Sequence, residues 1–403
     1  MSQIVFSGSF SSEGGLEWAE DGCYFVTEIL IKHHDSRSSW DFTCCCLPEE
    51  LLELILQRVT DIVDLYQCSN VCHSWRSIAR KQSALLPPQL LVLRNPNNVI
   101  DKIQMINMFI GSSSVCKIPE FNTRDGVRYM PMIVESSHGW LVMNYNTSKS
   151  RKVEGHLNYI CLYNPLSREE IWLPPLLLNS ENPKFVLSSK PTNPSCIVLA
   201  LHEKKLVFWR FGNKKWTFLK NVEYWINDII CYKDEFHALQ MKGNPPYPEV
   251  PYLLQVKFSP KCHVKSIPTK SNRSFYFAFN YLVESLCGNL WMVCTVLGNL
   301  GTSTLKFQVY KLHWKMMKWE KIKSLGDQAI VLACNDSVCV QADESTVYKK
   351  NCIYFTDDLC NGRGPSKEFG TYDLENETMN HLPFLNHDNP CYRWFKLDIW
   401  YND

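Results

Sequence analysis

The sequence feature that most constrains the fold is a unit that returns several times from residue 161 onward. Each copy is a strand-forming run, a polar turn and a second run that closes on a large side chain, at Trp172, Trp216, Trp319 and Met379. These residues are 44, 103 and 60 positions apart, and the middle interval fits two units if 252–268 supplies another copy. A period of about 40 to 50 residues with four strands in each unit is typical of β-propeller blades.

The rest of the C-terminal region has the same β character. From about residue 99 to the end, short apolar runs alternate with turns rich in Gly, Asn, Asp, Ser and Pro. The roughly 300 residues available predict a mainly β fold with a C-terminal propeller of six or seven blades. Two packed β-sandwiches are the alternative, which the blade-like spacing disfavours. We expect Trp172, Trp216, Trp291 and Trp319 to pack between sheets.

The stretch 47–80 has the strongest helical pattern. Pro48 fits the first helical position, where a missing N–H costs nothing, and Glu49 and Glu50 favour the positive end of the helix dipole. Apolar side chains then recur at helical spacing, at Leu51, Leu52, Ile55, Leu56 and Val59, and again at Val71, Trp75 and Ile78. Three short helices bury little surface alone. The pattern by itself therefore predicts a helical subdomain that packs against the rest of the chain.

The order of these residues closely resembles the F-box. The resemblance rests on Leu-Pro, two acids, paired Leu, Ile-Leu and then Val-Cys-x-x-Trp-Arg. It implies docking to a Skp-type adaptor, and through it to a cullin ubiquitin ligase, by apolar anchors between helices. The adaptor-binding residues that it implies are Leu47, Pro48, Leu51, Leu52, Ile55, Leu56, Leu65, Val71 and Trp75. Many relatives have Arg-Phe where this chain has Gln67 and Cys68, and this departure could weaken the internal packing or the adaptor contact.

A second resemblance covers roughly residues 100 to 385. Matching segments occur in the order found in the C-terminal β-propeller of a large plant F-box family, at 136–144 followed by 163–175, at 228–239, at 281–285 through 307–312 to 318–332, and at 351–358 and 370–379. That family includes suppressors of a brassinosteroid-pathway kinase, and Trp394-Phe395 fits its closing aromatic pair. The predicted organisation is a loosely ordered extension at 1–41, an F-box at 42–82, a linker at 83–98 and a substrate-recognition propeller at 99–403.

Composition excludes several classes of protein. Apolar residues make up 45% of the chain, which argues against global disorder, and the net charge of +1 argues against a general nucleic-acid or membrane-surface partner. The 18 cysteines are scattered, without C-x-x-C spacing, and we see no secretory start and no apolar run long enough to span a membrane. We therefore expect reduced cysteines and residence in the cytoplasm, the nucleus or both.

No catalytic constellation is evident. The chain lacks GxGxxG after a strand, a P-loop, a GxSxG elbow and HExxH. The spacing of His381, His387 and Cys391 fits no familiar metal site, and Asp357-Asp358 fits a turn. We therefore predict no catalytic residues, no metal and no cofactor.

Recognition is expected at loops of the rigid scaffold. The polar loop 144–156 and the proline-stiffened loop 243–251 supply the candidate target-binding residues, Tyr145, Lys149, Arg151 and Tyr247. The predicted function is the substrate-recognition subunit of a Skp–cullin–F-box ubiquitin ligase, with an unknown target protein. The alternative is a non-degradative protein that inhibits or sequesters a partner such as a kinase. An enzyme or glycan-binding propeller would need acids, His or metal ligands at the propeller axis.

Overall fold

A computed structural model gives the architecture of the chain, which divides into two compact units, 1–48 and 49–403. The structure describes the residues 47–59, 61–86, 89–94, 102–106, 113–119, 131–146, 156–178, 183–202, 205–220, 222, 226–242, 250–259, 262–271, 280–297, 304–332, 337–344, 346–356, 369–382 and 392–395. The predicted extension at 1–41 lies outside them. Within the described part, no helix is both long and apolar enough to cross a membrane.

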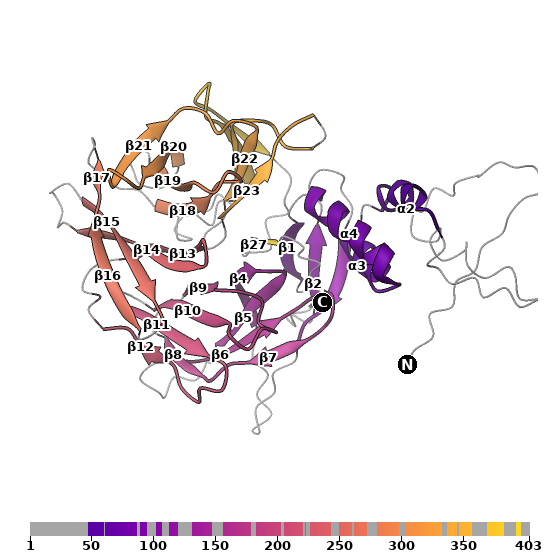
Figure 1. Cartoon of the computed structure of the whole chain (residues 1–403), viewed down its shortest axis with the longest axis horizontal. Helices are drawn as coiled ribbons and strands as arrows, with labels where there is room; N and C mark the ends of the chain where they lie inside the picture. Colours follow the sequence, from indigo (N-terminus) through magenta and orange to yellow (C-terminus); the bar gives the residue numbers. More distant parts are fainter. Residues whose placement is uncertain are drawn as a thin grey trace, which may run out of the picture. The chain divides into compact units, whose positions relative to one another are not determined.

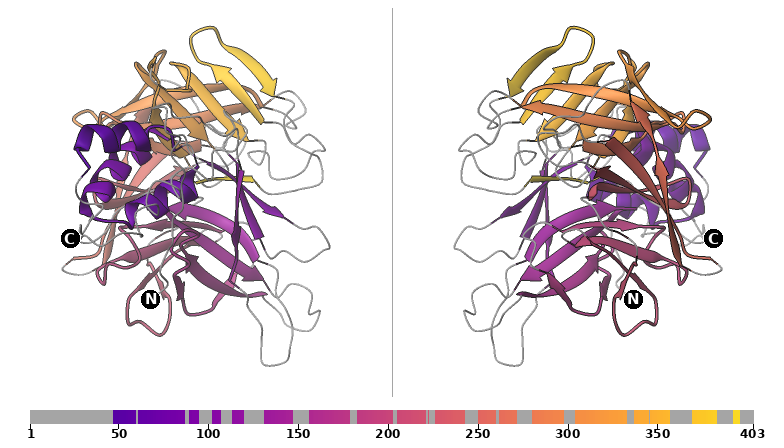
Figure 2. Two further views of the ribbon diagram at one scale, coloured as in Figure 1. Left: turned by 90° about the vertical axis from the view of Figure 1, so that its right-hand side faces the viewer. Right: turned by 90° about the vertical axis from the view of Figure 1, so that its left-hand side faces the viewer.

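Three helices open the second unit and pack together (Figure 2). They are α2 (Glu49–Leu56), α3 (Ile62–Ser69) and α4 (His73–Leu85). Asp61 caps α3, because its Oδ1 accepts the N–H groups of Val63 at 2.7 Å and Asp64 at 3.2 Å. Helix α4 runs three residues beyond the predicted F-box boundary at 82.

Five sheets follow, each built from strands consecutive in the chain. The first three contain β4 (Pro131–Ser137), β5 (Trp140–Asn146), β6 (His156–Tyr163), β7 (Glu170–Trp172) and β8 (Leu176–Leu178); β9 (Lys184–Leu187), β10 (Ile197–His202), β11 (Lys205–Arg210) and β12 (Thr217–Phe218); and β13 (Ile226–Tyr232), β14 (Glu235–Lys242), β15 (Val250–Lys257) and β16 (His263–Pro268). The other two contain β17 (Lys270–Ser271), β18 (Asn280–Glu284), β19 (Leu290–Leu297), β20 (Thr304–His313) and β21 (Lys318–Ile322); and β22 (Gln328–Leu332), β23 (Ser337–Gln341), β24 (Cys352–Thr356), β25 (Phe369–Asp373) and β26 (Thr378–Leu382).

A sixth sheet joins the two ends of the β region. It contains β1 (Gln89–Arg94), β2 (Lys102–Ile106), β3 (Ser113–Lys117) and β27 (Tyr392–Phe395). Strand β27 pairs antiparallel with β1, so the last described strand of the chain completes the first sheet. The prediction that 83–98 is a linker is therefore wrong for 89–94, because these residues form a strand of the propeller.

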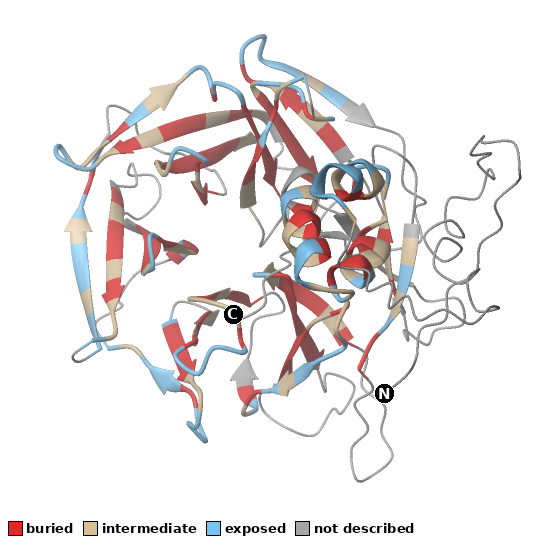
Figure 3. Ribbon diagram, turned by 45° about the vertical axis from the view of Figure 1, so that its right-hand side comes forward, coloured by how far each residue is buried: buried red, intermediate tan, exposed pale blue. Residues whose placement is uncertain are grey.

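The sheets lie around a common centre, as Figure 1 shows. Their inner strands contact one another in the order β27, β4, β9, β13, β18 and β23. Apolar clusters fill the space between neighbouring sheets. Buried residues concentrate in the inner and middle strands, while an outer strand such as β16 is largely exposed (Figure 3). These are the features of a β-propeller, and the predicted fold class is confirmed.

The repeat seen in the sequence is the outer hairpin of a sheet. Its copies coincide with β6–β7, β11–β12, β15–β16, β20–β21 and β25–β26. Trp216 and Trp319, which close two of them, are buried, as is Trp291. Trp172 was predicted to be core and is 37% exposed. One side of its ring packs against Tyr145, with the centroids 5.2 Å apart. The other side is exposed because β7 is the edge strand of its sheet.

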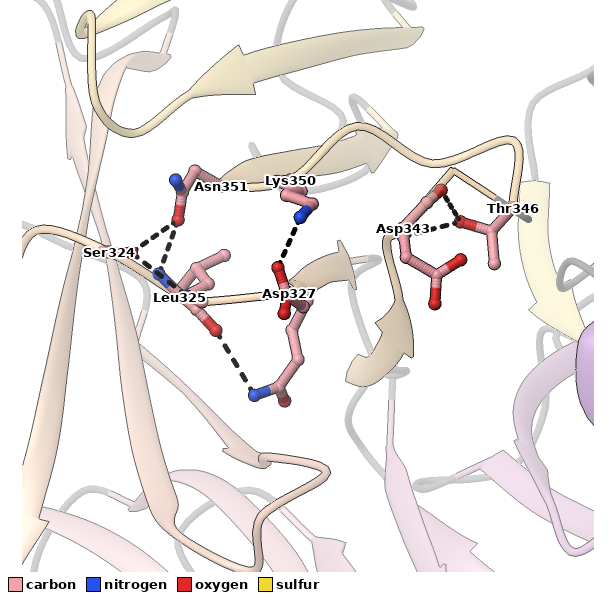
Figure 4. Close-up of polar contacts among 9 residues, drawn as sticks. Ser324, Leu325, Asp327, Asp343, Thr346, Lys350 and Asn351 are labelled. Atoms are coloured by element: carbon pink, nitrogen blue, oxygen red, sulfur yellow. Dashed lines mark hydrogen bonds and ion pairs between the residues drawn. The ribbon is translucent and has the colours of Figure 1, made fainter.

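The sheet β22–β26 departs from simple strand order. Strands β22 and β24 pair in parallel, and every residue of both is buried. The segment that joins β23 to β24 is held by a network of polar contacts (Figure 4). Asn351 has a φ of 60°, and its Oδ1 accepts Leu325 N at 2.7 Å and Ser324 Oγ at 3.0 Å. Lys350 pairs with Asp327 at 2.6 Å beside it.

Candidate functional site

The interior of the helical domain is apolar and closed. Leu52 and Leu56 of α2 are fully buried, and the side chains that join them are Ile62, Leu65, Cys68, Trp75, Ile78 and Ala79. The spacing of four between Leu52 and Leu56 places both on one face of α2. On the outside, Lys81 of α4 bonds to Glu49 at 3.0 Å and Glu53 at 3.2 Å of α2. The three helices thus form a packed unit, and salt bridges on its surface join α4 to α2.

The opposite face of α2 is apolar and exposed. Leu51 is 48% exposed and Leu54 is 56% exposed. Leu51 and Leu54 are three residues apart, so their side chains are neighbours on the helix surface. Two adjacent exposed leucines on a folded helix mark a surface suited to a partner. We call Leu51 and Leu54 the α2 face.

The nine residues predicted to bind the adaptor divide by burial. The fully or largely buried ones are Leu52, Leu56, Leu65 and Trp75, and the half-buried ones are Leu47, Ile55 and Val71. Pro48 and Leu51 are exposed. In this chain the buried four therefore stabilise the helical unit, and Pro48 and Leu51 are the ones presented at its surface. The sequence reasoning missed Leu54, which the i, i+3 spacing from Leu51 could have identified.

Gln67 and Cys68, which stand where many relatives have Arg-Phe, lie on opposite sides of α3. Gln67 is exposed, whereas Cys68 is buried in the interior. Burial raises the pKa of the Cys68 thiol to about 11, so this side chain is a neutral, small apolar group at neutral pH. A thiol fills less space than an aromatic ring there, so this substitution acts on the internal packing of the domain.

The candidate residues of the loop 144–156 do not form one exposed site. Tyr145 belongs to β5 and is fully buried, and its hydroxyl donates to Pro119 O at 2.8 Å. Burial raises its pKa, and the ring is not available to a partner. The prediction for Tyr145 is therefore wrong, because the strand continues through 146 and directs the ring inward. Lys149, Arg151 and Tyr247 lie outside the described residues.

Two turns of the sheet β17–β21 instead carry exposed apolar side chains. Trp314, in the β20–β21 turn, stacks on Tyr232 of β13 at 5.7 Å with an interplanar angle of 10°. Tyr232 donates its hydroxyl to Gly288 O at 2.7 Å, which brings the β18–β19 turn alongside. Leu286 of that turn is 50% exposed, and Met316 next to Trp314 is exposed as well. We call Leu286, Trp314 and Met316 the turn surface, and Tyr232 is buried beneath it.

The propeller axis is polar where the inner strands converge. Lys184 of β9 bonds to Asp228 Oδ1 of β13, and both side chains are buried. Asp228 Oδ1 also accepts Ile229 N at 2.8 Å, and its Oδ2 accepts Leu282 N of β18 at 2.5 Å. One carboxylate therefore links three successive sheets. Glu135 of β4 is another buried acid of the inner strands.

No set of metal ligands is found among the residues that the structure describes. His387 and Cys391, weighed as ligands with His381, lie outside those residues. The described cysteines are free thiols, several of them buried. Burial raises the pKa of Cys231 to about 12 and that of Cys161 further, so neither is a thiolate nucleophile at neutral pH.

A packed three-helix unit with an exposed apolar face, followed by a closed ring of sheets, defines an F-box protein with a β-propeller. The family model described as KIB1-4 beta-propeller matches residues 112–373, and an F-box-like model matches residues 44–85. The chain belongs to the KIB1-4 β-propeller family of F-box proteins. Both resemblances read from the sequence are thereby confirmed.

Relatives in Arabidopsis thaliana match over most of their length. The putative F-box protein At3g25750 is 26% identical over 341 residues, which is 77% of this chain and 86% of the relative. The F-box protein At2g26160 is 22% identical over 78% of this chain and 95% of its own length. The F-box protein At2g05970 is 24% identical over 90% of this chain and 97% of its own length.

Proposed function

We propose that this chain is the substrate-recognition subunit of a Skp–cullin–F-box ubiquitin ligase. The observation that carries the proposal is an F-box-like helical unit with a closed core and an exposed α2 face, joined in one chain to a propeller. The helical unit would bind a Skp-type adaptor, and through it a cullin. The propeller would bind the target protein.

The α2 face supplies the chemistry of adaptor docking. Leu51 and Leu54 are about half exposed, so an apolar groove that covers them gains about half of the roughly 1.5–3 kcal/mol that burying a whole leucine side chain contributes. Glu49, Glu50 and Glu53 of the same helix lie along one side of this face, and Glu49 and Glu53 are paired with Lys81. An apolar centre with a charged rim is typical of specific protein interfaces.

The chain would carry out no bond chemistry itself. By holding a target near a ubiquitin-loaded enzyme bound elsewhere in the assembly, it would raise the effective concentration of target lysines. Its turn surface is the described part of the propeller best suited to the target, because aromatic side chains on rigid turns are common interface anchors. We propose that it resides in the cytoplasm, the nucleus or both, because these compartments keep cysteine thiols reduced.

The test is binding of a purified Skp-type adaptor to the full chain and to two charge variants. Leu51→Glu places a charge in the proposed contact and should cost about 1–3 kcal/mol, or about 5- to 150-fold in affinity. Leu286→Glu is the matched control, because the same change is made at a leucine of similar exposure on the propeller. It should leave adaptor binding unchanged. Trp75→Ala is unsuitable, because Trp75 is buried and its loss would destabilise the domain.

Equal adaptor binding by wild type, Leu51→Glu and Leu286→Glu would place the adaptor on another surface. Absence of adaptor binding by the folded wild type would refute the ligase function. The non-degradative binding protein would then be the better explanation, and target abundance insensitive to proteasome inhibition would support it.

A further inference from the structure

The hairpin β11–β12 forms the outer edge of its sheet. Strand β12 is the last in the strand order, pairs among the described strands with β11 alone, and lies at the outside of the ring in Figure 1. Leu219 N donates to Leu206 O at 2.8 Å, so the antiparallel alternation directs the backbone N–H and C=O of Phe218 away from β11. Thr217 is exposed, and Phe218 is 52% exposed. Strand β12 therefore presents an open edge with which another extended chain can pair.

The same hairpin carries an excess of positive charge. Residues 205–220 contain no acid, and their basic residues are Lys205, Arg210, Lys214, Lys215 and Lys220. The wider window 202–225 contains six basic residues and two acids, in a chain whose net charge is +1. The guanidinium of Arg210 donates at 2.9 Å to the backbone carbonyl that follows β15, whereas the four lysines are exposed. These lysines therefore give the hairpin a local positive charge that the chain as a whole does not have.

Acids of the described residues do not neutralise these lysines. None of the four forms an ion pair within the part of the chain that the structure describes. In the preceding sheet, Glu170 of β7 accepts Trp172 Nε1 at 3.1 Å, and it alternates with Ile171, which packs against the cluster between the two sheets. Glu170 therefore lies on the other face of that sheet. In the following sheet, the outer strand β16 contains no acid. The four lysines are thus available to an acidic partner.

The charges lie at both ends of the open edge. Val207 stands opposite Phe218 and packs into the cluster between this sheet and the preceding one. Alternation puts Lys205 and Lys220 on that same face, and continuing the register by two residues places them opposite each other. Like charges directly opposite each other repel, so an acid placed between them is stabilising. The turn with residues 214–215 follows the other end of β11, about 17 Å away for its six residues.

The kind of partner follows from this combination of charge and open backbone. Lysines on an edge strand commonly prevent the same edges of two copies from pairing, and here a second copy would bring the same positive charges. The lysines instead attract an acidic chain. A nucleic acid would satisfy the lysines, but its phosphates offer no strand to pair with the backbone of Phe218. An acidic polypeptide in the extended conformation satisfies both.

We propose that the edge of β12 binds an acidic, extended segment of a partner protein by adding it to the sheet as a further strand. Backbone hydrogen bonds to Phe218 fix the segment, its acids pair with the lysines at the two ends, and an apolar side chain covers the Phe218 ring. The inference rests on the proposed function in taking this partner to be the target of the propeller. It adds that the target is recognised through a strand-forming segment of about five or six residues.

The test measures the binding of fluorescein-labelled peptides to the full chain by fluorescence anisotropy. The peptide EVEVEVE alternates acids with valine, and KVKVKVK has the same pattern with the opposite charge. EVEPEVE keeps the acids, but its central proline lacks the N–H that strand pairing needs. We expect EVEVEVE to bind with a Kd of about 10–500 µM and about tenfold more weakly when salt screens the charges. The other two peptides should bind at least about tenfold more weakly than EVEVEVE.

Two sets of substitutions locate the binding. Lys205→Gln combined with Lys220→Gln removes two charges from the face of Phe218 and should weaken EVEVEVE about fivefold. Phe218→Ser removes the apolar contact and should weaken it to a similar degree, about fivefold. All three side chains are exposed, so folding is not at risk. Lys265→Gln combined with Lys323→Gln is the matched control, because it removes two exposed lysines from other sheets, and it should leave binding unchanged.

Several results would overturn the proposal. They are equal binding of EVEVEVE and either control peptide, wild-type affinity in both the Lys205/Lys220 double variant and Phe218→Ser, and no binding of EVEVEVE at about 1 mM. A short DNA duplex that binds more tightly than EVEVEVE, and is lost in the same variants, would also overturn it and assign the surface to nucleic acid.

Adaptor binding measured on the same preparations separates this inference from the proposed function. The variants of β11 and β12 should bind the adaptor like the wild type. Absence of EVEVEVE binding with intact adaptor binding would overturn the edge assignment alone. Binding of EVEVEVE without any adaptor binding would support the edge assignment and remove the ligase function.

Discussion

Replacing Asp228 with alanine should destabilise the propeller more than any change to an exposed ion pair. The carboxylate lies between three sheets, with Lys184 of β9 on one side and Leu282 of β18 on the other. Removing it breaks a buried ion pair with Lys184, and breaking such a pair by deleting one partner costs about 3–5 kcal/mol. It also leaves the N–H groups of Ile229 and Leu282 without this acceptor, at about 1–3 kcal/mol each when they stay dry. Water that enters beside the inner strands can relieve part of the loss, so we expect about 4 kcal/mol or more.

The measurement is the free energy of unfolding from chemical denaturation, followed by tryptophan fluorescence and circular dichroism. Asp327→Ala is the matched control, because it removes the same carboxylate from an ion pair with Lys350 in which both partners are more than half exposed. That pair should contribute at most about 1 kcal/mol. Lys184→Met, alone and combined with Asp228→Ala, completes a cycle that isolates the coupling of the pair.

A loss in Asp228→Ala no larger than that in Asp327→Ala would refute the reasoning. The carboxylate would then be hydrated in the folded state, and the three inner strands would be held by apolar packing alone. A double variant as unstable as the sum of the two single variants would likewise show that Lys184 and Asp228 do not act as a pair.

Two further predictions concern other parts of the chain. A thiol reagent at neutral pH should modify the exposed Cys262 and Cys287 quickly. It should modify the buried Cys68, Cys161 and Cys294 slowly. Cys68 should react faster only as the pH nears its raised pKa of about 11. Peptide mass mapping of the labelled chain measures this, and fast labelling of Cys294 in the native protein would contradict the described burial. Asn351→Ala should lower the free energy of unfolding by about 2–3 kcal/mol (Figure 4). The change removes the side-chain oxygen that accepts two hydrogen bonds. It also puts alanine at a φ of 60°, a left-handed conformation that Asn tolerates better. Asn213→Ala, in an exposed turn, should stay within about 0.5 kcal/mol, and equal midpoints of denaturation for the two variants would disprove the assigned role of Asn351.

Local pattern predicted the parts of this fold that depend on neighbours in the chain. The outer hairpins are joined by short turns, so their apolar runs and polar turns appear together in the sequence at β6–β7 or β20–β21. The helical spacing of Leu52, Leu56 and Trp75 likewise indicated a packed interior. The same pattern could not say which side of α2 faces inward, because Leu51 and Leu52 are equally apolar and only the packing of α3 and α4 distinguishes them.

The sequence pattern of neighbouring residues could not predict contacts between segments that are far apart in the chain. Strand β1 was assigned to a linker because its partner β27 lies about 300 residues away, and the edge position of β7 leaves Trp172 exposed for a reason that no neighbour in sequence reveals. Tyr145 reads as a loop residue from its polar surroundings, yet the pairing of β5 with β6 extends through 146 and buries it.

The propeller axis shows why the site chemistry was harder to foresee than the fold. Glu135, Lys184 and Asp228 stand far apart in the sequence, each within a short apolar strand, and none forms a motif with its neighbours. A charged residue inside an apolar strand is costly to bury without a partner. Lys184 and Asp228 meet this requirement by pairing with each other across neighbouring inner strands. This argument needs only the ring and the strand assignments, so isolated charges on inner strands are the sequence signal to seek in other propellers of this kind.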